Sequence, residues 1–190
     1  MVAIEPPLPP GCMSTIWGDD ERFVKTYFST FSKKLVYSTF DWGIRDKDGY
    51  YFILGRTDDV INVAGHRLGT REIEEAVNMH PGIAECAVVG VVDSLKGQMP
   101  LAFAVSKTTL NTKEEKEKLE KEVMQTVDKQ LGAIGRPKAV HFVTLLPKTR
   151  SGKTLRRSIA ALAEGRDPGD LTTIEDPNAL QQIKDSLGIK

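Results

Sequence analysis

Two apolar runs decide the fold of this sequence: ECAVVGVV at residues 85–92 and LAFAV at residues 101–105. Short runs rich in Val, Ala and Leu, bounded by Gly, Pro and polar residues, are typical of strands buried in a sheet. Residues 140–145, VHFVTL, form a third run of this kind. Together the three runs predict that a sheet forms the centre of this part of the chain.

Helical patterns alternate with these strands. Residues 70–79 begin with Thr70, which can cap a helix, and they end before His-Pro-Gly, which stops one. Residues 112–131 begin with the Thr-x-x-Glu pattern of a capping box and carry apolar side chains at helical spacing. Leu155, Ile159 and Leu162 mark a last amphipathic helix. The alternation predicts a small α/β sandwich from about residue 60 onwards.

The two ends of the chain differ in composition from this region. Residues 1–11 hold four prolines, which suit an extended connector and exclude a helix interior. Residues 50–54 and 60–63 are short and β-rich, and Gly65 is expected to form the turn after the second of them. Residues 165–177 collect Gly, Pro and Asp and are expected to form a loop, with one more short helix beyond it.

Composition narrows the class of protein. The chain has 190 residues, with 26 basic against 26 acidic side chains. This balance argues against nucleic acid or an anionic membrane as a partner, because both are usually bound through an excess of basic residues. No apolar run approaches the roughly 18 residues of a membrane span, and the first residues lack the pattern of a signal peptide. Cys12 and Cys86 are too few for a disulfide framework or a zinc site. We therefore expect a cytoplasmic protein.

One basic segment, LPKTRSGKT at residues 146–154, lies between a predicted strand and a predicted helix. Its end imitates a phosphate-binding P-loop, but that motif needs a glycine where this chain has Pro147. Proline has no backbone N–H to offer a phosphate, so the P-loop interpretation fails. What remains is a flexible loop that displays Lys148, Arg150 and Lys153, either as a solvated basic turn or as part of a site.

A second segment, GRTDDVINVAGHR at residues 55–67, could hold a site or a joint. Its adjacent carboxylates, Asp58 and Asp59, form either a surface ion pair with the nearby arginine or the boundary of a hinge. The small residues before His66 would let a ligand approach the backbone closely. His66 and His80 lie far apart without a third ligand, so we do not expect a metal bound by imidazoles.

These two segments resemble the C-terminal motifs of the adenylate-forming acyl-CoA synthetases. Residues 39–50 resemble the motif that precedes them, although Phe40 stands where the family prefers glycine. The Pro-rich start, residues 17–20 and residues 165–170 resemble the propionyl-CoA synthetase branch. The resemblance implies an α+β fold: residues 58–190 would be the small C-terminal domain, a β-sheet flanked by helices. Residues 1–57 would be a β-rich remnant of the large N-terminal adenylation domain, whose phosphate loop and carboxylate pocket this chain lacks.

The resemblance also implies roles for individual residues. Lys153 matches the catalytic lysine of the adenylation step, and Asp58 matches the hinge residue. Ala64 and Gly65 match positions that contact CoA. The positions that match nucleotide-binding residues are Asp41 and Arg56, at the ribose, and Arg67, near the phosphate.

The backbone carbonyls of Asn78, His80 and Ile83 match positions that can hold a structural cation in acetyl-CoA synthetases.

The implied reaction makes propionyl-CoA from propionate, ATP and CoA through an acyl-adenylate, with Mg²⁺ as cofactor and AMP and pyrophosphate as products. Implied partners are the missing N-terminal domain and a lysine acyltransferase and deacylase acting on Lys153. Two alternatives stay open: an acetyl-CoA or other short-chain acyl-CoA synthetase, and an inactive stand-alone module that binds nucleotide or CoA or regulates another protein.

Overall fold

The computed structural model describes the backbone of residues 1–189 and their side chains, except that of Asp58. The chain forms two compact units, Met1–Asp58 (unit 1) and Asp59–Lys190 (unit 2). This boundary lies beside the one that the sequence predicts. That residues 1–57 belong to a larger adenylation domain stays a prediction.

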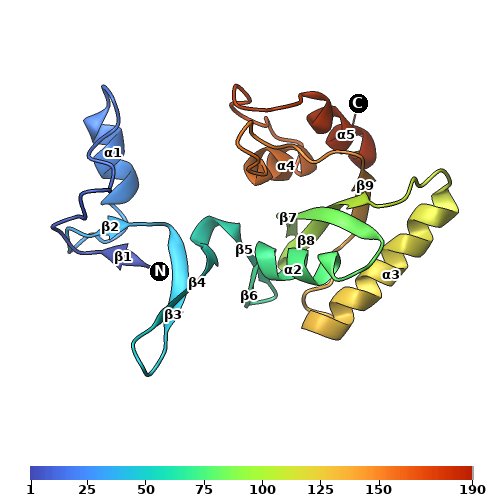
Figure 1. The fold of residues 1–190 in the computed structure, drawn as a ribbon, viewed down its shortest axis with the longest axis horizontal. Coiled ribbons are helices and arrows are strands. Elements are labelled where there is room, and N and C mark those ends of the chain that lie inside the picture. The colour runs from blue at the N-terminus through green and yellow to red at the C-terminus, as the bar shows by residue number, and fades with distance from the viewer. Residues whose placement is uncertain (190) are drawn as a thin grey trace. The chain divides into compact units, whose positions relative to one another are not determined.

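Unit 2 is built on one sheet of strands β5 (Val60–Val63), β6 (His66–Gly69), β7 (Ile83–Asp93), β8 (Gly97–Ser106) and β9 (Val140–Val143) (Figure 1). The strand order is β6-β5-β8-β7, and β9 pairs in parallel with β8. Strands β7 and β8 pair antiparallel along their whole length, so the two apolar runs that decide the fold lie against each other. All the strands predicted in this region are confirmed, and β7 and β8 extend beyond the predicted runs.

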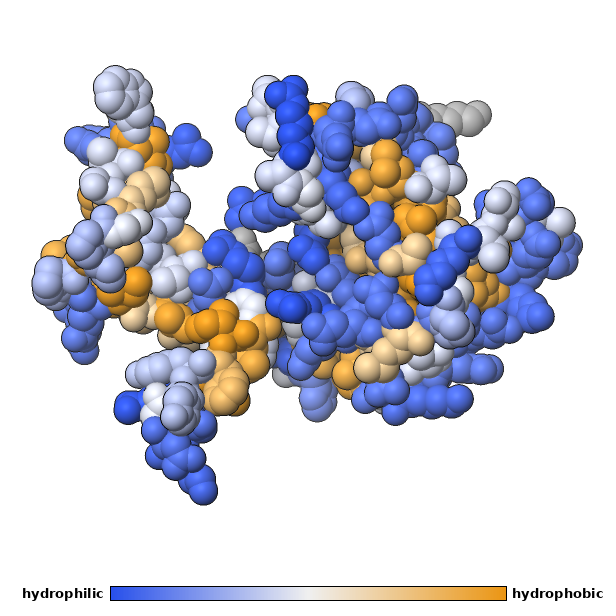
Figure 2. All heavy atoms as spheres, in the orientation of Figure 1, coloured by the Kyte–Doolittle hydropathy of each residue, from blue (hydrophilic) through white to orange (hydrophobic). Residues whose placement is uncertain are grey.

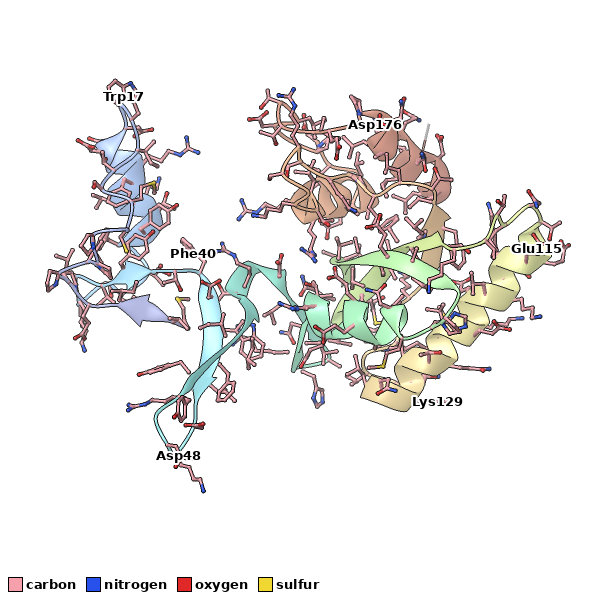
Figure 3. All side chains as sticks on the ribbon, viewed as in Figure 1. Trp17, Phe40, Asp48, Glu115, Lys129 and Asp176 are labelled. Carbon is pink, nitrogen blue, oxygen red and sulfur yellow. The ribbon has the colours of Figure 1, made fainter. Side chains whose placement is uncertain are left out.

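The helices of unit 2 are α2 (Thr70–Asn78), α3 (Lys113–Leu131), α4 (Arg156–Ala163) and α5 (Asn178–Leu187). The capping box of α3 is confirmed, because the Thr112 hydroxyl accepts from the Glu115 N–H at 3.2 Å and the Glu115 carboxylate accepts from the Thr112 N–H at 3.1 Å (Figure 3). The predicted cap of α2 is wrong. Gly69 is the cap residue and donates its N–H to Glu72, while Thr70 is buried in the first turn.

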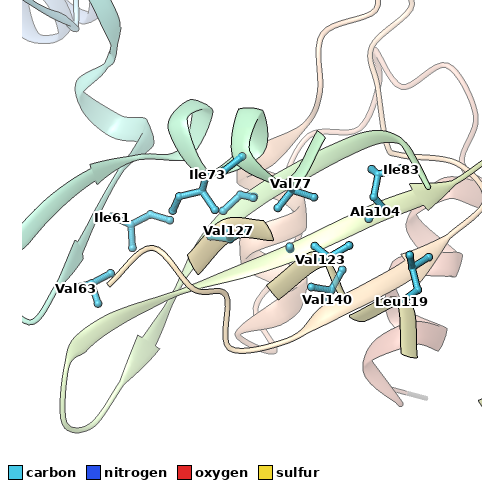
Figure 4. Packing of buried hydrophobic residues seen from close by; sticks show 13 residues of the cluster. Ile61, Val63, Ile73, Val77, Ile83, Ala104, Leu119, Val123, Val127 and Val140 are labelled. Carbon is cyan, nitrogen blue, oxygen red and sulfur yellow. The ribbon is translucent and has the colours of Figure 1, made fainter. Parts of the chain in front are cut away.

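Helices cover both faces of this sheet. Successive residues of a strand point to opposite faces, so Val88 and Ala102 pack in one hydrophobic core, whereas Val89 and Phe103 pack in the other. The first core contains side chains of α2 and α3 (Figure 4), including Ile73, Val77, Val123 and Val127. The second contains side chains of α4 and α5, including Ile159, Leu162, Leu180 and Ile183. The predicted α+β fold, a sheet flanked by helices, is confirmed.

Unit 1 contains more helix than the sequence predicts. Its strands are β1 (Ala3–Ile4), β2 (Tyr37–Ser38), β3 (Asp41–Arg45) and β4 (Tyr51–Arg56), and a short 3₁₀ helix, Thr57–Asp59, follows. The helix α1 (Asp20–Tyr27) was not expected. The side chain of Asp19 caps it by accepting from the Arg22 N–H at 3.0 Å. The expectation of a β-rich segment is therefore incomplete.

The β3–β4 hairpin of unit 1 exposes apolar side chains on both of its faces. Consecutive residues of β4 are exposed by 39% to 68%, although consecutive side chains point in opposite directions. The exposed apolar residues in and beside the hairpin are Ile44, Tyr50, Tyr51, Phe52, Ile53 and Leu54, and Figure 2 shows hydrophobic surface there. Contiguous apolar surface of this kind is typical of a region that packs against further protein. Within residues 1–189, no helix is long and apolar enough to cross a membrane.

Candidate functional site

In unit 1, the hairpin register brings Asp41 and Arg56 together. They are cross-strand partners of β3 and β4, and 3.8 Å separates Arg56 Nη1 from Asp41 Oδ1. Arg56 Nη1 also donates to the Thr39 carbonyl at 3.1 Å. The two side chains keep exposed fractions of 43% and 34%, so a carboxylate and a guanidinium lie side by side within reach of a ligand.

Phe40, next to this pair, has a backbone conformation that usually requires glycine. Its φ is +59°, in the left-handed region that costs a residue with a Cβ about 1–2 kcal/mol. This backbone explains why glycine is the residue expected here. The ring of Phe40 contacts Tyr27, with 5.8 Å between the ring centroids, and its centroid lies 5.6 Å from the Arg56 guanidinium carbon (Figure 3). Phe40 therefore covers one side of Arg56, as glycine could not.

Asp58 lies in the 3₁₀ helix at the boundary between the two units. Its side chain lies outside the part of the chain that the structure describes. The preceding residue, Thr57, is held by the Phe40 carbonyl, which accepts from the Thr57 N–H at 2.7 Å. The hinge role of Asp58 stays a prediction.

In unit 2, Ala64 and Gly65 form the two-residue turn between β5 and β6. Both have positive φ, +50° and +87°, as the type I′ turn of a tight hairpin requires. The conformation is strained for Ala64, which donates its N–H to the Lys96 carbonyl at 2.8 Å. A Cβ added at Gly65 would meet nothing within 4 Å. The predicted turn is confirmed, and its backbone is open to a ligand.

Arg67 follows this turn on β6, where it is exposed and lies opposite Asn62 of β5.

Asn78, His80 and Ile83 surround the C-terminal end of α2. The His80 carbonyl accepts from the Ile83 N–H at 3.0 Å, while His80 Nδ1 accepts from the Gly82 N–H at 3.1 Å. His80 Nε2 lies 3.6 Å from a carboxylate oxygen of Glu122 on α3. These contacts give His80 a structural role in the turn. A cation bound by the three carbonyls stays a prediction. Among the side chains that the structure describes, no group of three or more from His, Cys, Asp or Glu could hold a metal ion.

The segment around Lys153, which the sequence predicts as a loop, forms a hydrogen-bonded turn. Its flexibility stays a prediction. Gly152 has φ +82° and donates its N–H to the Thr149 carbonyl at 2.8 Å. The Thr149 N–H donates to the Lys153 carbonyl at 2.8 Å, and the Lys153 N–H donates to the Thr149 hydroxyl at 3.1 Å. The side chain of Lys153 is exposed. A closed turn with an exposed ammonium can present one positive charge to a ligand.

We call residues 147–155 the lysine turn. An ion pair lies near each of its two ends. Lys148 pairs with Glu85 of β7. On the other side, Arg156 Nε and Nη2 donate to Glu74 of α2 at 2.9 and 2.6 Å. Glu74 is buried and also accepts from the Val88 N–H at 2.9 Å. Burial works to lower the pKa of Arg156, but the hydrogen bonds and charge of Glu74 outweigh it and raise that pKa.

The pairing of Glu74 with Arg156 has no signal in the sequence. They are 82 positions apart, so no local spacing joins them.

A protein-family model described as the AMP-binding enzyme C-terminal domain matches residues 72–153. Propionate–CoA ligase of Escherichia coli strain K12 is 64% identical over 189 residues, which cover 98% of this chain and 30% of that protein. Acetyl-coenzyme A synthetase of Pyrobaculum arsenaticum is 50% identical over 175 residues, covering 92% of this chain and 25% of that protein. The chain therefore spans less than a third of the length of these relatives.

Solved structures agree with this relationship. The anthranilate CoA ligase AuaEII, in complex with anthranoyl-AMP, matches with a TM-score of 0.63 and 28% identity over 79% of this chain and 28% of that one. The ATP-bound RpMatB-BxBclM chimera B1 matches with a TM-score of 0.63 and 28% identity, over 84% of this chain and 34% of that one. The fold, the motifs and these relatives together place the chain in the family of the adenylate-forming acyl-CoA synthetases.

Proposed function

We propose that this chain is the part of an AMP-forming acyl-CoA ligase that supplies the lysine of the adenylation step. The ligase makes propionyl-CoA from propionate, ATP and CoA through propionyl-adenylate. The observation that carries the proposal is the exposed ammonium of Lys153 on a closed turn, at the last residue of the family match. The identity of 64% to a propionate–CoA ligase supports propionate as the acid.

Lys153 suits the first step because negative charge gathers there. A propionate oxygen attacks the α-phosphorus of ATP, the bond to the bridging oxygen breaks, and pyrophosphate leaves with the electron pair. An ammonium on a long side chain can contact both the carboxylate and the α-phosphate during this change. Mg²⁺ would reach the site on the phosphates of ATP, because it prefers phosphate oxygens and water to an all-protein cage.

Asp41 and Arg56 would hold the nucleotide by its ribose. The carboxylate of Asp41 can accept from both ribose hydroxyls, while the guanidinium of Arg56 can donate to them. Their placement on facing strands, 3.8 Å apart, supports a joint role. Arg67 would approach the nucleotide phosphate, a role that its exposure allows.

The second step would use the Ala64–Gly65 turn. The CoA thiol attacks the carbonyl of propionyl-adenylate, AMP leaves, and the thioester forms. The open backbone at Gly65 suits contact with the pantetheine arm of CoA. Because Asp58 lies at the unit boundary, we propose that unit 2 turns about it between the two steps. The carbonyls of Asn78, His80 and Ile83 would hold a structural cation.

The remaining part of the ligase would supply the phosphate loop and the carboxylate pocket. The exposed apolar hairpin β3–β4 supports this, because such a surface is expected to pack against the rest of a larger domain. We place the ligase in the cytoplasm. A lysine acyltransferase and a deacylase would regulate it at Lys153, since acylation removes the charge that the first step needs.

An acetyl-CoA synthetase is the second candidate, and the acetyl-coenzyme A synthetase relatives favour it over other acids. A stand-alone module that binds nucleotide or CoA has no specific observation in its favour.

The test is thioester formation by the full-length ligase with propionate, acetate and butyrate. We expect the highest kcat/KM with propionate, and no thioester from the 190-residue chain alone. A ten-fold preference for acetate would contradict propionate as the acid. Absence of AMP formation with all three acids would contradict the ligase, and thioester formation by the 190-residue chain would contradict the division of the site.

A further inference from the structure

A segment far along the chain pairs with the lysine turn. The Glu175 N–H donates to the Lys148 carbonyl at 2.9 Å, and the Arg150 N–H donates to the Thr173 carbonyl at 3.1 Å. Between these two bonds, Thr149 and Ile174 form an antiparallel β-bridge. One arm of the lysine turn is thus paired, residue by residue, with a second stretch of backbone.

That stretch, Leu171–Glu175, is itself fixed to the body of unit 2. Ile174 is only 9% exposed and belongs to the second hydrophobic core, which also contains Leu146 and Ile159 from the two sides of the lysine turn. The Ile174 N–H donates to the Leu171 carbonyl at 3.0 Å and so closes a local turn. Asp176, labelled in Figure 3, follows this stretch and leads into α5. The stretch can therefore hold the lysine turn against the core.

The stretch lies outside the family match, which ends at Lys153. We propose that Leu171–Glu175 is a positioning element for Lys153: it fixes the arm Lys148–Arg150 and thereby sets where the ammonium stands during adenylation. This rests on the proposed function. The ion pair with Glu85 holds Lys148, the first residue of this arm. The backbone bonds to Leu171–Glu175 hold the arm on both sides of Thr149, which accepts from the N–H groups of Gly152 and Lys153.

Adenylation should be sensitive to the position of the Lys153 ammonium. The side chain of Lys153 is exposed, and the hydrogen bonds of this residue within the turn are made by its N–H and carbonyl groups. The position of the ammonium therefore depends on the position of that backbone. A displacement of about 1 Å in a positioning group can slow an enzymatic step by about 10²-fold. A shift of the arm is thus expected to slow adenylation while ATP still binds.

The test compares two substitutions at one position. Glu175→Pro removes the backbone N–H that donates to the Lys148 carbonyl. Glu175→Ala removes the exposed side chain and keeps that N–H. Ile174 is in an extended bridge, a conformation that suits the residue before a proline. In the full-length ligase we expect Glu175→Pro to lower kcat for propionyl-adenylate formation by about 10-fold or more, with the KM for ATP within about 2-fold of wild type. Thioester formation from supplied propionyl-adenylate should be unchanged, and Glu175→Ala should match wild type in both steps.

Amide hydrogen exchange of the 190-residue chain gives a readout without activity. Because a lost hydrogen bond typically shifts an equilibrium about 2- to 12-fold, we expect Glu175→Pro to speed exchange at Arg150, Gly152 and Lys153 by such a factor, and Glu175→Ala to leave it unchanged. Ile174→Ala, which loosens the stretch without a proline, should act in the same direction.

Unchanged exchange at the lysine turn in both Glu175→Pro and Ile174→Ala would overturn the inference. Faster exchange with wild-type adenylation would overturn it as well, because the stretch would then be structural only. If the wild-type ligase formed no adenylate, the proposed function would fail, and Leu171–Glu175 could have no role in adenylation. The amide exchange rates of the lysine turn would still show whether Leu171–Glu175 holds that turn in place.

Discussion

Arg156 and Glu74 form an ion pair in unit 2. Removing the charge of Arg156 should destabilise unit 2 more than removing the charge of Glu74. The Glu74 side chain is 9% exposed, against 27% for Arg156. Arg156→Met leaves a buried carboxylate with one of its three donors, the Val88 N–H. Breaking a buried ion pair in this way costs about 3–5 kcal/mol, and we expect about 3 kcal/mol because water reaches the guanidinium side.

Glu74→Gln should cost less, about 1–2 kcal/mol. The amide oxygen can still accept from Val88, and Arg156 can turn towards water through its exposed side. The double variant has no buried charge, so its destabilisation should be smaller than that of Arg156→Met alone. This order distinguishes a buried pair from a surface one, for which both single variants would cost about 0–1 kcal/mol.

The assay is urea unfolding of the 190-residue chain followed by two signals. Far-UV circular dichroism reports mainly on unit 2, which holds four of the five α-helices of residues 1–189. Tryptophan fluorescence reports on unit 1, because Trp17 and Trp42 both lie there, and it should not shift. A destabilisation by Arg156→Met no larger than that by Glu74→Gln would refute the reasoning.

Two further predictions concern backbone strain and pH. Ala64→Gly should stabilise unit 2 by about 1 kcal/mol, because glycine adopts the φ of +50° without strain; urea unfolding measures this, and a loss of stability would contradict it. Burial lowers the pKa of His141 from its ordinary 6.5, against a hydrogen bond to the Ser186 carbonyl and the charge of Glu120, which raise it. As pH falls, His141 is therefore protonated in the unfolded chain before it is protonated in the folded chain. Its neutral form contributes to stability above about pH 6.5, and that contribution is lost as pH falls below this value. His141→Phe, which can keep a stack on Phe103, should lose less stability between about pH 7 and pH 5.5 than wild type does, and equal losses would contradict this.

The central elements of the fold could be predicted because their signals are local. The runs that became β7 and β8 are apolar and short, and α3 begins with a complete capping box. Helix α1 was missed because its eight residues, DERFVKTY, are mostly polar and too few to establish a helical period.

The surroundings of the site could be predicted only in part. The positions of Lys153 and Gly65 follow from local motifs, whereas the backbone bonds that pair the lysine turn with Thr173 and Glu175 leave no mark in a sequence pattern. The pair of Asp41 and Arg56 likewise depends on the register of a hairpin.

The most direct test of the central claim measures the two half-reactions of the full-length ligase carrying Lys153→Ala. Arg150→Ala, which removes the other exposed cation in the same turn and keeps its backbone N–H, is the matched control. Removing a charged donor at a reacting phosphate should slow propionyl-adenylate formation by about 10²–10³-fold, while thioester formation from supplied propionyl-adenylate and CoA stays near the wild-type rate. The control should keep both rates. Adenylate formation by Lys153→Ala at the wild-type rate, or equal losses in both half-reactions, would contradict the assignment of Lys153 to the adenylation step.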